Sequence, residues 1–319
     1  MSSGVQKAKI EVRLDRGQRA DAAVAAVLRR LLAVIAENLV GAIAGDDIEY
    51  LHQLRIAVRR SRTVQRQFKR VFPALDLPGL RSDFRWLQRA TGESRDLDVY
   101  VDEFASLTKL LPEGMRADLE PLRAVLIERR LAARADLERA LRSPRTTQLL
   151  DDSERLLESL VELPLDDRPH ATDTIGELGG KRIAKVYRRI VSMGEEIEES
   201  SAAEEFHELR KKGKELRYLL ELFGAQLFDE DVVRPLIDSL KDLQELLGRH
   251  QDREVQITMI QSLTAEVAPR PGGDAACLAM GVLVARLRDD ELAARREFAA
   301  PFAALAAPDR RAAVRDAFG

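Results

Sequence analysis

A run of cations on one predicted helix is the strongest chemical feature of this sequence. Seven Lys or Arg residues and no Asp or Glu lie between His52 and Arg70. Part of the run follows the spacing i, i+3, i+7, i+10, i+14, which places side chains along one helix face over about 21 Å. These residues are His52, Arg55, Arg59, Arg62 and Arg66. Because like charges at this spacing repel, we expect an external anion to be their partner.

The basic pattern occurs again in the second half of the chain, at an offset of 155 residues. The repeated positions His52, Arg55, Arg59, Arg62 and Phe68 are matched by His207, Arg210, Lys214, Arg217 and Phe223. The basic residues on each of these helix faces form a stripe. Lys211 and Lys212 add to the stripe of the second half, whereas Glu215 occupies the position that matches Arg60. We therefore expect the second stripe to be less basic at its edge.

Another motif repeats in the same order, at an offset of 156 residues. In the first half it contains Arg85, Leu87, Gln88, Gly92, Asp96, Asp98 and Val99, and in the second half Lys241, Leu243, Gln244, Gly248, Asp252, Glu254 and Val255. Two motifs that recur in order at nearly one offset indicate an internal duplication. We expect the two halves to face each other about a pseudo-two-fold axis.

Long helices are predicted to position these motifs. Apolar residues recur at helical spacing between turn signals rich in Gly, Pro, Asp and Ser. The predicted long helices span 20–44, 47–72, 79–110 and 115–142 in the first half, and 175–199, 203–228, 231–267 and 274–304 in the second. Each half also contains a short helix. The predicted fold class is all-α, with two pseudo-symmetric four-helix bundles that arise from the duplication.

The longest break between predicted helices gives the domain boundaries. It spans 164–180 and contains two prolines and three glycines, which is typical of a linker. We expect an N-terminal extension over 1–19, a first helical bundle over 20–163, a linker over 164–180 and a second bundle over 181–319. The two bundles together would form one domain.

Composition favours a soluble intracellular protein. Apolar residues make up 45% of the 319 residues, and the single cysteine, Cys277, suits a reducing cytoplasm. Neither a signal peptide nor an apolar stretch of 18 or more residues is present, so we expect a cytoplasmic location and no membrane partner. The net charge of -3 conceals segregated charges, since residues 195–205 carry six acidic residues and no basic ones.

Further cations could extend the basic surface. Arg85 and Lys241 hold matching positions seven residues before the repeated glycines, although a structural ion pair is the alternative for both. Lys181, Lys185 and Arg188 share one face of the helix that opens the second half. That patch is asymmetric, because the first half has only two arginines in the corresponding region.

The repeated histidines allow two interpretations. Glu49 and Glu204 each precede a repeated histidine by three residues, and we expect them to favour the protonated rings of His52 and His207. The alternative is a metal site. Its oxygen ligands would be Asp96, Asp98, Asp252 and Glu254. These acids have a plainer expected role in capping helices and pairing with Arg or His, and no His-Glu-x-x-His motif or cysteine cluster supports a metal.

Sequence motifs for catalysis are absent. We find no nucleophile elbow, P-loop or dinucleotide-binding glycine motif. We therefore expect a protein that is not an enzyme, with no catalytic residue, no cofactor and no bound metal.

The segments 52–62 and 85–99, with their second-half counterparts, resemble the CHAD family, the conserved histidine α-helical domain. The resemblance covers nearly the whole chain from about residue 20. It implies two four-helix bundles with pseudo-two-fold symmetry, inorganic polyphosphate bound in a basic central cavity, and association with polyphosphate granules. By resemblance the cavity residues would be His52, Arg55, Arg59, Arg62, His207, Arg210, Lys214 and Arg217. A triphosphate-tunnel domain is often fused to the family, but its alternating Glu and Lys signature is absent here.

Binding of inorganic polyphosphate in a basic cleft between the two bundles is the leading hypothesis. The predicted binding residues are His52, Arg55, Arg59, Arg62, Arg66, Arg85, Lys181, Lys185, Arg188, His207, Arg210, Lys211, Lys214, Arg217 and Lys241. One alternative is a metal-dependent phosphohydrolase that uses the histidines and the Asp pairs. A nucleic-acid-binding protein is a second, although 5% aromatic residues and the lack of a DNA-binding motif argue against it. A third is a scaffold that recruits a protein through residues 195–205.

Overall fold

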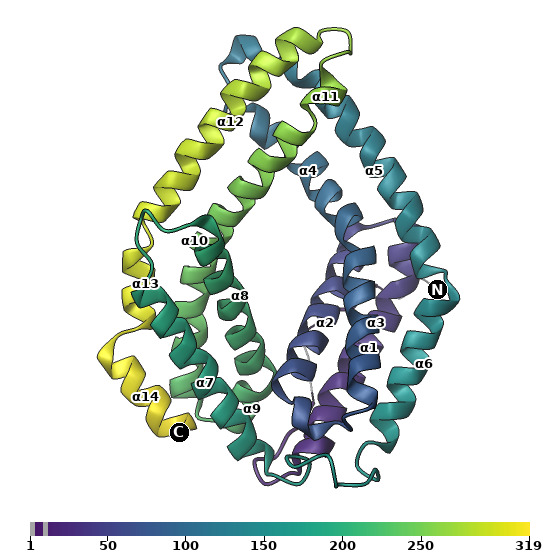
Figure 1. Cartoon of the computed structure of the whole chain (residues 1–319), viewed down its shortest axis with the longest axis vertical. Helices are drawn as coiled ribbons and strands as arrows, with labels where there is room; N and C mark the ends of the chain where they lie inside the picture. The colour runs from purple at the N-terminus through teal and green to yellow at the C-terminus, as the bar shows by residue number, and fades with distance from the viewer. Residues whose placement is uncertain (1–3, 9–11) are drawn as a thin grey trace.

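The computed structural model describes residues 4–8 and 12–319, which form a helical protein (Figure 1). The first half contains the α-helices α1 (Ala20–Ala44), α2 (Ile48–Gln67), α3 (Asp76–Ala90), α4 (Gly92–Thr108), α5 (Glu120–Leu141) and α6 (Pro144–Ser159). The second half contains α7 (Ile175–Glu195), α8 (Ala203–Leu219), α9 (Ala225–Leu227), α10 (Glu230–Ser262), α11 (Thr264–Val267), α12 (Gly273–Arg296), α13 (Ala299–Leu305) and α14 (Pro308–Phe318). Three 3-10 turns, η1 (Lys69–Val71), η2 (Glu113–Met115) and η3 (Ala117–Leu119), and the π-helical turn η4 (Leu220–Gly224) complete the set.

The predicted all-α class is confirmed. Within the described residues the β structure is limited to an isolated bridge between Arg19 and Thr174. Across those same residues we find no helix that is long and apolar enough to cross a membrane.

Local capping explains where the helices that carry the basic stripes begin. The Asp47 side chain accepts a hydrogen bond of 2.8 Å from the Glu49 backbone N–H and so caps α2. Just before it, Gly45 ends α1 with a φ of 76°, a left-handed conformation that glycine adopts without steric cost. This tight connection places α1 and α2 side by side, with the apolar face of α2 against α1.

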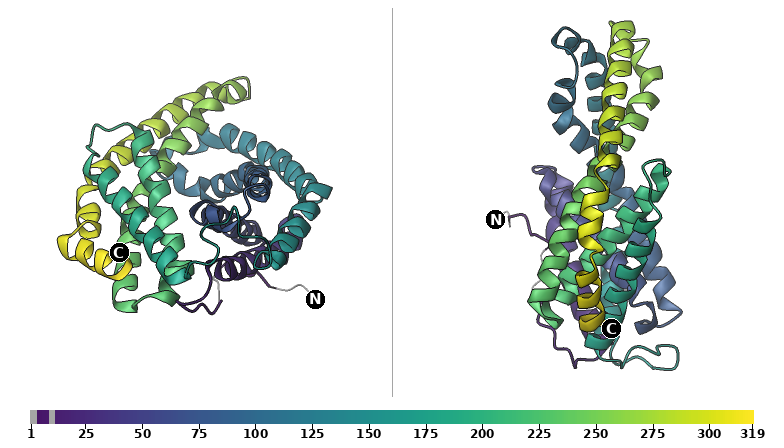
Figure 2. Two further views of the ribbon diagram at one scale, coloured as in Figure 1. Left: turned by 60° about the horizontal axis from the view of Figure 1, so that its bottom comes forward. Right: turned by 90° about the vertical axis from the view of Figure 1, so that its left-hand side faces the viewer.

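The long helices form an elongated frame (Figure 1). Helices α5 and α6 follow one long side, while α12, α13 and α14 follow the other. Inside the frame, α2 and α8 face each other from the two halves, and α4 and α10 lead from them toward the narrow end. The side view in Figure 2 shows that the molecule is narrow in the direction across this frame.

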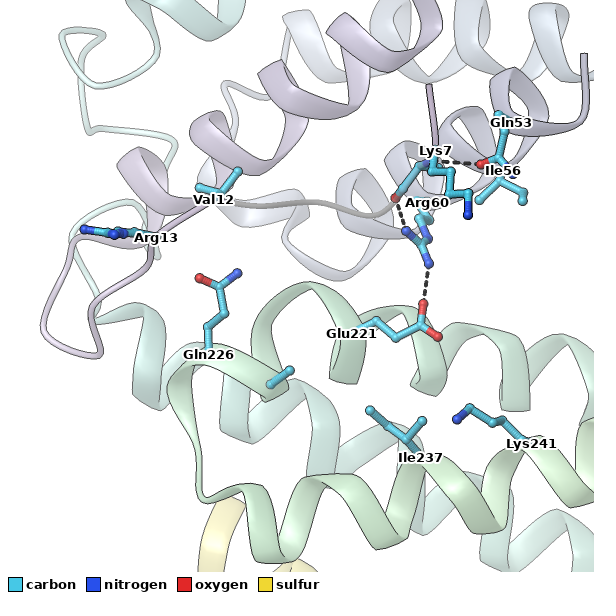
Figure 3. Close-up of a pocket in the computed structure, with 12 residues that line it drawn as sticks. Lys7, Val12, Arg13, Gln53, Ile56, Arg60, Glu221, Gln226, Ile237 and Lys241 are labelled. Atoms are coloured by element: carbon cyan, nitrogen blue, oxygen red, sulfur yellow. Dashed lines mark hydrogen bonds and ion pairs between the residues drawn. The ribbon is translucent and has the colours of Figure 1, made fainter. Parts of the chain in front are cut away.

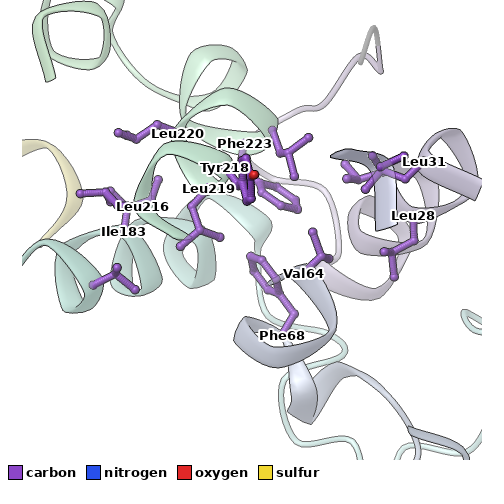
Figure 4. Close-up of a cluster of buried hydrophobic side chains, with 14 of the residues drawn as sticks. Leu28, Leu31, Val64, Phe68, Ile183, Leu216, Tyr218, Leu219, Leu220 and Phe223 are labelled. Carbon is purple, nitrogen blue, oxygen red and sulfur yellow. The ribbon is translucent and has the colours of Figure 1, made fainter. Parts of the chain in front are cut away.

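Two hydrophobic clusters hold the frame together, and each draws residues from both halves. The larger one includes α1, α2, α3 and α6 of the first half and α7, α8, α10 and α14 of the second. In its centre the rings of Phe68 and Phe223 lie 4.8 Å apart (Figure 4). The smaller cluster, at the narrow end, joins α4 and α5 to α10, α11 and α12. The halves are therefore not separate cores, because each cluster buries apolar surface of both.

Contacts between repeat-matched residues relate the two halves. Phe68 and Phe223 occupy matching positions and contact each other. Arg60 pairs with Glu221, and Arg66 pairs with Glu215 at 3.1 Å. Since Glu215 matches Arg60 and Glu221 matches Arg66, these two ion pairs are reciprocal. Reciprocal contacts of this kind are what a two-fold arrangement of similar surfaces produces.

The helix predicted over 79–110 is divided in the structure, and those predicted over 231–267 and 274–304 are each divided near their C-terminal ends. The helix expected over 79–110 consists of α3 and α4, which are separated at Thr91. The buried Thr91 hydroxyl donates a 2.8 Å hydrogen bond to the Leu87 carbonyl, a side-chain bond that competes with the helix and bends it. Leu247 occupies the matching position in the second half, where α10 continues without a break.

The predicted linker is helical from Ile175 onward, because α7 begins there and Thr174 caps it. The preceding residues are fixed by a buried arginine. Arg168 pairs with Asp21 at 3.0 Å, both side chains being fully buried. The same guanidinium donates to the carbonyls of Val71 at 2.9 Å and Leu163 at 2.8 Å. A buried pair with its remaining hydrogen bonds satisfied ties this segment to the first half.

Candidate polyanion-binding cavity

A cavity of about 590 Å³ lies between the two halves, where the N-terminal parts of α2 and α8 face each other. Helices α4 and α10 complete its wall. The lining residues are His52, Arg55 and Arg59 from α2, Arg95, Asp96, Val99, Tyr100 and Glu103 from α4, His207, Arg210 and Lys214 from α8, and Gln251, Asp252, Val255 and Gln256 from α10. The structure thus brings together six of the predicted binding residues, three from each stripe.

The cavity has more cations than anions. Its wall carries five Arg or Lys residues and two histidines, but only three carboxylates. Arg210 lies 3.6 Å from Asp252. Throughout residues 4–8 and 12–319, no carboxylate oxygen comes within 4.0 Å of the charged groups of Arg55, Arg59, Arg95 or Lys214. Four of the five Arg and Lys side chains of the wall therefore have no carboxylate within ion-pair distance in the described chain.

The break between α3 and α4 positions Arg55. Its guanidinium donates to the Gln88 carbonyl at 3.1 Å and to the Thr91 hydroxyl at 3.0 Å. Gly92 follows directly, and the guanidinium passes close to it. Both acceptors are neutral, so they hold the side chain in place without removing its charge. The remaining N–H groups of Arg55 face the cavity wall and can bind an anion.

Burial, together with the crowding of like charges, lowers the pKa values of two cavity residues. Burial, together with the neighbouring Arg59 and Arg95, lowers the pKa of Arg55 to about 10, although Asp96 opposes this effect. Burial lowers the pKa of Lys214 to about 7, and Arg210 and Arg59 lower it further. Near neutral pH, Lys214 therefore lies close to its point of half-protonation. A bound anion would favour its charged form.

Glu49 favours the protonated ring of His52 as expected, but other effects outweigh it and the pKa of His52 is lowered. Burial and the charge of Arg95 lower the pKa of His52, and Glu49 offsets only part of this effect. The matching ring of His207 has a different neighbour, because its Nδ1 forms a hydrogen bond with the Gln251 side chain. Gln251 occupies the position that matches Arg95.

Arg62 and Arg66 continue the α2 stripe past the cavity. Arg62 donates to the Gln88 side chain, and burial and four neighbouring arginines lower its pKa. Arg66 donates to Glu215 at 3.1 Å and lines a separate pocket at the C-terminal end of α2. In the second half, Arg217 lies 3.4 Å from Glu221 instead of facing the cavity.

The predicted cations of the third helices do not reach the cavity. Arg85 is exposed on α3, where it contributes to the positive charge around Arg62. Lys241 pairs with Asp238 at 3.0 Å, as the alternative of a structural ion pair predicted. It also lines a separate pocket of about 960 Å³, which contains Lys7 and the Arg60–Glu221 pair (Figure 3).

The remaining predicted residues lie outside the cavity as well. Lys211 on α8 pairs with Glu208 at 2.6 Å and with Glu204 at 3.7 Å. On α7, Lys181 lies 3.8 Å from Glu177, and Arg188 is exposed. Lys185 faces the same separate pocket as Arg66. The α7 patch thus contributes to a second basic site and not to the central cavity.

The sequence analysis missed several residues of the wall, above all Arg95. Arg95 directly precedes Asp96 in the repeated motif. The motif could therefore have drawn attention to it as a further cation of the predicted helix. Tyr100 and Gln256, which also match across the repeat, lie one helical turn after Asp96 and Asp252 and line the same cavity. Tyr100 and Gln256 are thus equivalent positions of the two halves, but their residue types gave no indication of anion binding.

The proposed metal ligands do not come together. In the part of the chain that the structure describes, no group of three or more His, Cys, Asp or Glu residues is arranged to hold a metal ion. Asp96 and Asp252 lie beside cavity arginines, while the nearest charges to Asp98 are Arg130, Arg95 and Arg134. Among these four acids, only Asp252 forms an ion pair in the described chain, with Arg210 at 3.6 Å, so the expected pairing with Arg holds for that residue alone. The four acids do not cap helices, since they lie inside α4 and α10.

Comparison with known proteins identifies the fold. The chain has a TM-score of 0.74 and 28% sequence identity to the crystal structure of the CHAD domain from the plant Ricinus communis, covering 91% of this chain and 94% of that one. PptA from Streptomyces chartreusis has the same fold, with a TM-score of 0.70 and 18% identity over 89% of this chain and 99% of that one.

Sequence comparison agrees with the structural match. Two uncharacterized proteins of Mycobacterium tuberculosis are each 28% identical over 225 residues, which is 67% of this chain but 40% of theirs. The chain thus spans less than half the length of these curated relatives. The CHAD domain family model matches residues 26–261. Together with the repeated motifs and the helical fold, this match shows that the chain belongs to the CHAD domain family.

Proposed function

We propose that this protein binds inorganic polyphosphate in the central cavity and does so without catalysis. One observation carries the proposal: Arg55, Arg59, Arg95 and Lys214 converge on one cavity from both halves, and no carboxylate of the described residues pairs with them. Crowded, unpaired cations are stabilised by a multiply charged guest. The resemblance to the CHAD family supports polyphosphate as that guest.

The chemistry of the wall suits phosphate chains. Each arginine can donate two parallel hydrogen bonds to one phosphate, and a buried lysine adds a point charge. The cavity cations would replace the counterions that a free polyphosphate chain carries. Affinity should therefore fall steeply with salt concentration, because each neutralised phosphate releases a condensed cation.

The alternatives have less support in the geometry. A phosphohydrolase would need the acids gathered around a metal or a water, but Asp96 and Asp252 lie beside arginines. A protein-recruiting acidic segment would need free carboxylates over 195–205. Several are occupied within the chain, since Glu195 pairs with Arg311 at 2.7 Å and Glu199 with Arg296 at 3.2 Å.

Removing two unpaired cations tests the proposal. We expect the double variant Arg59→Gln/Lys214→Gln to bind polyphosphate at least about 100-fold more weakly, because each lost hydrogen bond to a charged group contributes about 1.5–3 kcal/mol. Isothermal titration calorimetry with polyphosphate would measure the change. Arg139→Gln/Arg155→Gln is the matched control, since it removes the same charge from exposed positions on α5 and α6. We expect it to change affinity by less than about threefold.

The outcome that would refute the assignment is unchanged affinity in the cavity variant. Equal losses in both double variants would indicate that net charge, not the cavity, controls binding. A competition experiment of polyphosphate against RNA and duplex DNA at physiological salt would distinguish polyphosphate binding from nucleic-acid binding. Phosphate release from polyphosphate in the presence of Mg²⁺ or Mn²⁺ would contradict the non-catalytic part of the proposal.

A further inference from the structure

A second basic pocket, of about 340 Å³, lies at the C-terminal end of α2. Four elements besides α2 contribute cations to it: Lys69 from η1, Arg81 from α3, Lys212 from α8, and Arg182, Lys185 and Arg189 from α7. Among the residues that the structure describes, no acidic side chain lines it. An exposed surface normally mixes charges, as the narrow end of this molecule does with its Arg129–Glu266 and Arg270–Glu128 pairs.

Most cations of this pocket have no partner in the protein. In the described part of the chain, no carboxylate lies within 4.0 Å of the charged groups of Lys69, Arg81, Arg182, Lys185 or Arg189. Arg182 is partly buried, and both burial and the nearby Arg70 lower its pKa. This pocket therefore resembles the central cavity, because both are lined by several cations that lack a carboxylate partner in the described chain.

Glu215 fixes the other two cations at the pocket. This carboxylate is only 2% exposed and accepts from Arg66 at 3.1 Å and from Lys212 at 2.9 Å. Arg66 uses only its Nε–H in that bond, and Lys212 keeps further N–H donors. The buried acid therefore positions two donors whose remaining N–H groups can bind an anion, which lowers the entropic cost of binding.

A continuous line of cations connects this pocket to the cavity. Arg59 lines the cavity and Arg66 lines the pocket, two helical turns or about 10 Å apart on α2. Arg62 lies between them on the same face, near Arg85 and Arg89 of α3. The second half has no such line. Its residues at the positions that match Arg66, Arg81 and Arg89 are Glu221, Ile237 and Glu245.

We propose that this pocket is a second phosphate-binding site, which holds a distal stretch of the same polyanion that fills the central cavity. The inference rests on the proposed function of the cavity. Because the basic line leaves the cavity on one side only, the bound chain has a preferred exit toward α7. A chain long enough to reach both sites gains contacts that tripolyphosphate cannot make at once, so the protein prefers long chains.

Charge reversal on α7 tests the second site. We expect Lys185→Glu/Arg189→Glu to reduce affinity for long-chain polyphosphate at least about tenfold and to lower the slope of log affinity against log salt by about 2, one for each lost cation. The matched control Lys181→Glu/Arg188→Glu reverses two exposed charges of the same helix outside the pocket. It should leave affinity within about threefold of the unchanged protein.

Tripolyphosphate separates the two sites. By calorimetry the unchanged protein should bind two tripolyphosphates per chain but one long chain, and Lys185→Glu/Arg189→Glu should bind one tripolyphosphate. Equal losses in the pocket variant and its control, or an unchanged preference for long chains in the pocket variant, would overturn the second site but not the cavity. An unchanged protein that binds neither ligand would overturn both proposals.

Discussion

The two halves of this molecule share a repeat but present different charges to each other. On α2, Arg60 and Arg66 face the second half, where the matching positions are Glu215 on α8 and Glu221 in η4. In both of these ion pairs between the halves, the first half supplies the cation and the second half the acid. Two copies of the first half would bring arginine against arginine at both positions. Only the contact between unlike halves is complementary, which favours the intramolecular arrangement.

The walls of the cavity differ in the same way. In the first half a bend at Thr91 provides neutral acceptors that hold Arg55, while in the second half the unbroken α10 offers Asp252 to Arg210. Arg59 is matched by Lys214, and Arg95 by Gln251. The first wall therefore carries three arginines, whereas the second carries Arg210 and Lys214, whose pKa is lowered to about 7.

Reversing the charge of Glu215 should have the largest effect. Glu215→Lys would place a cation beside Arg66 and Lys212 at a site only 2% exposed, and we expect the free energy of unfolding to fall by at least about 3 kcal/mol. Urea denaturation would measure this. Adding Arg66→Glu should restore part of the loss. Glu158→Lys, at an exposed acid, should cost less than about 1 kcal/mol. Equal stability of both single variants would contradict the charge division between the halves.

Lys214 occupies the position in the second half that matches Arg59 in the first, and this difference predicts that affinity for polyphosphate depends on pH. The pKa of Lys214 is lowered to about 7, and a bound polyanion would raise it, so we expect binding to take up a proton. We therefore expect affinity for polyphosphate to fall about tenfold as the pH rises from about 7 to about 8.5. Calorimetry at several pH values would show this decline.

Two variants sharpen that test. Lys214→Arg should abolish the decline over this pH range, because arginine stays charged. Arg59→Lys combined with Lys214→Arg would move the titrating group to the first wall and should restore a pH dependence. A decline that persists in Lys214→Arg would show that another group takes up the proton.

The smallest expected effect concerns His52. Arg95→Gln would give the first wall the residue type that the second has at Gln251, and it removes a positive charge that lowers the pKa of His52. We expect this pKa to rise, as NMR titration of the imidazole would show. The distant exposed variant Arg142→Gln should not change it. An unchanged His52 titration in Arg95→Gln would show that the charge of Arg95 does not lower this pKa, which would leave burial, Arg59 and Arg55 as its causes.

Features that depend on one helix could be predicted from the sequence, whereas features that depend on contacts between helices could not. Helical periodicity predicted the helical class, and the two repeated motifs predicted a set of binding residues. Six residues of that set line the cavity, namely His52, Arg55, Arg59, His207, Arg210 and Lys214. Those positions lie within single helices, where spacing alone decides which side chains share a face. Arg66 and Lys185 were assigned to the same site, but they meet at a different pocket, because the assignment required knowing how α2 packs against α7.

By itself, the sequence determined which residues carry charge and which of them share a helix face, and its repeated motifs predicted an internal duplication. Only the tertiary structure decided which cations remain unpaired. Arg217 and Lys241 looked equivalent to cavity residues but lie near Glu221 and Asp238, whereas Arg59 and Lys214 have no such neighbour in the described chain. The reason is physical: whether a charge is available depends on what lies within a few ångströms of it, and for these sites that is set by packing between helices distant in sequence.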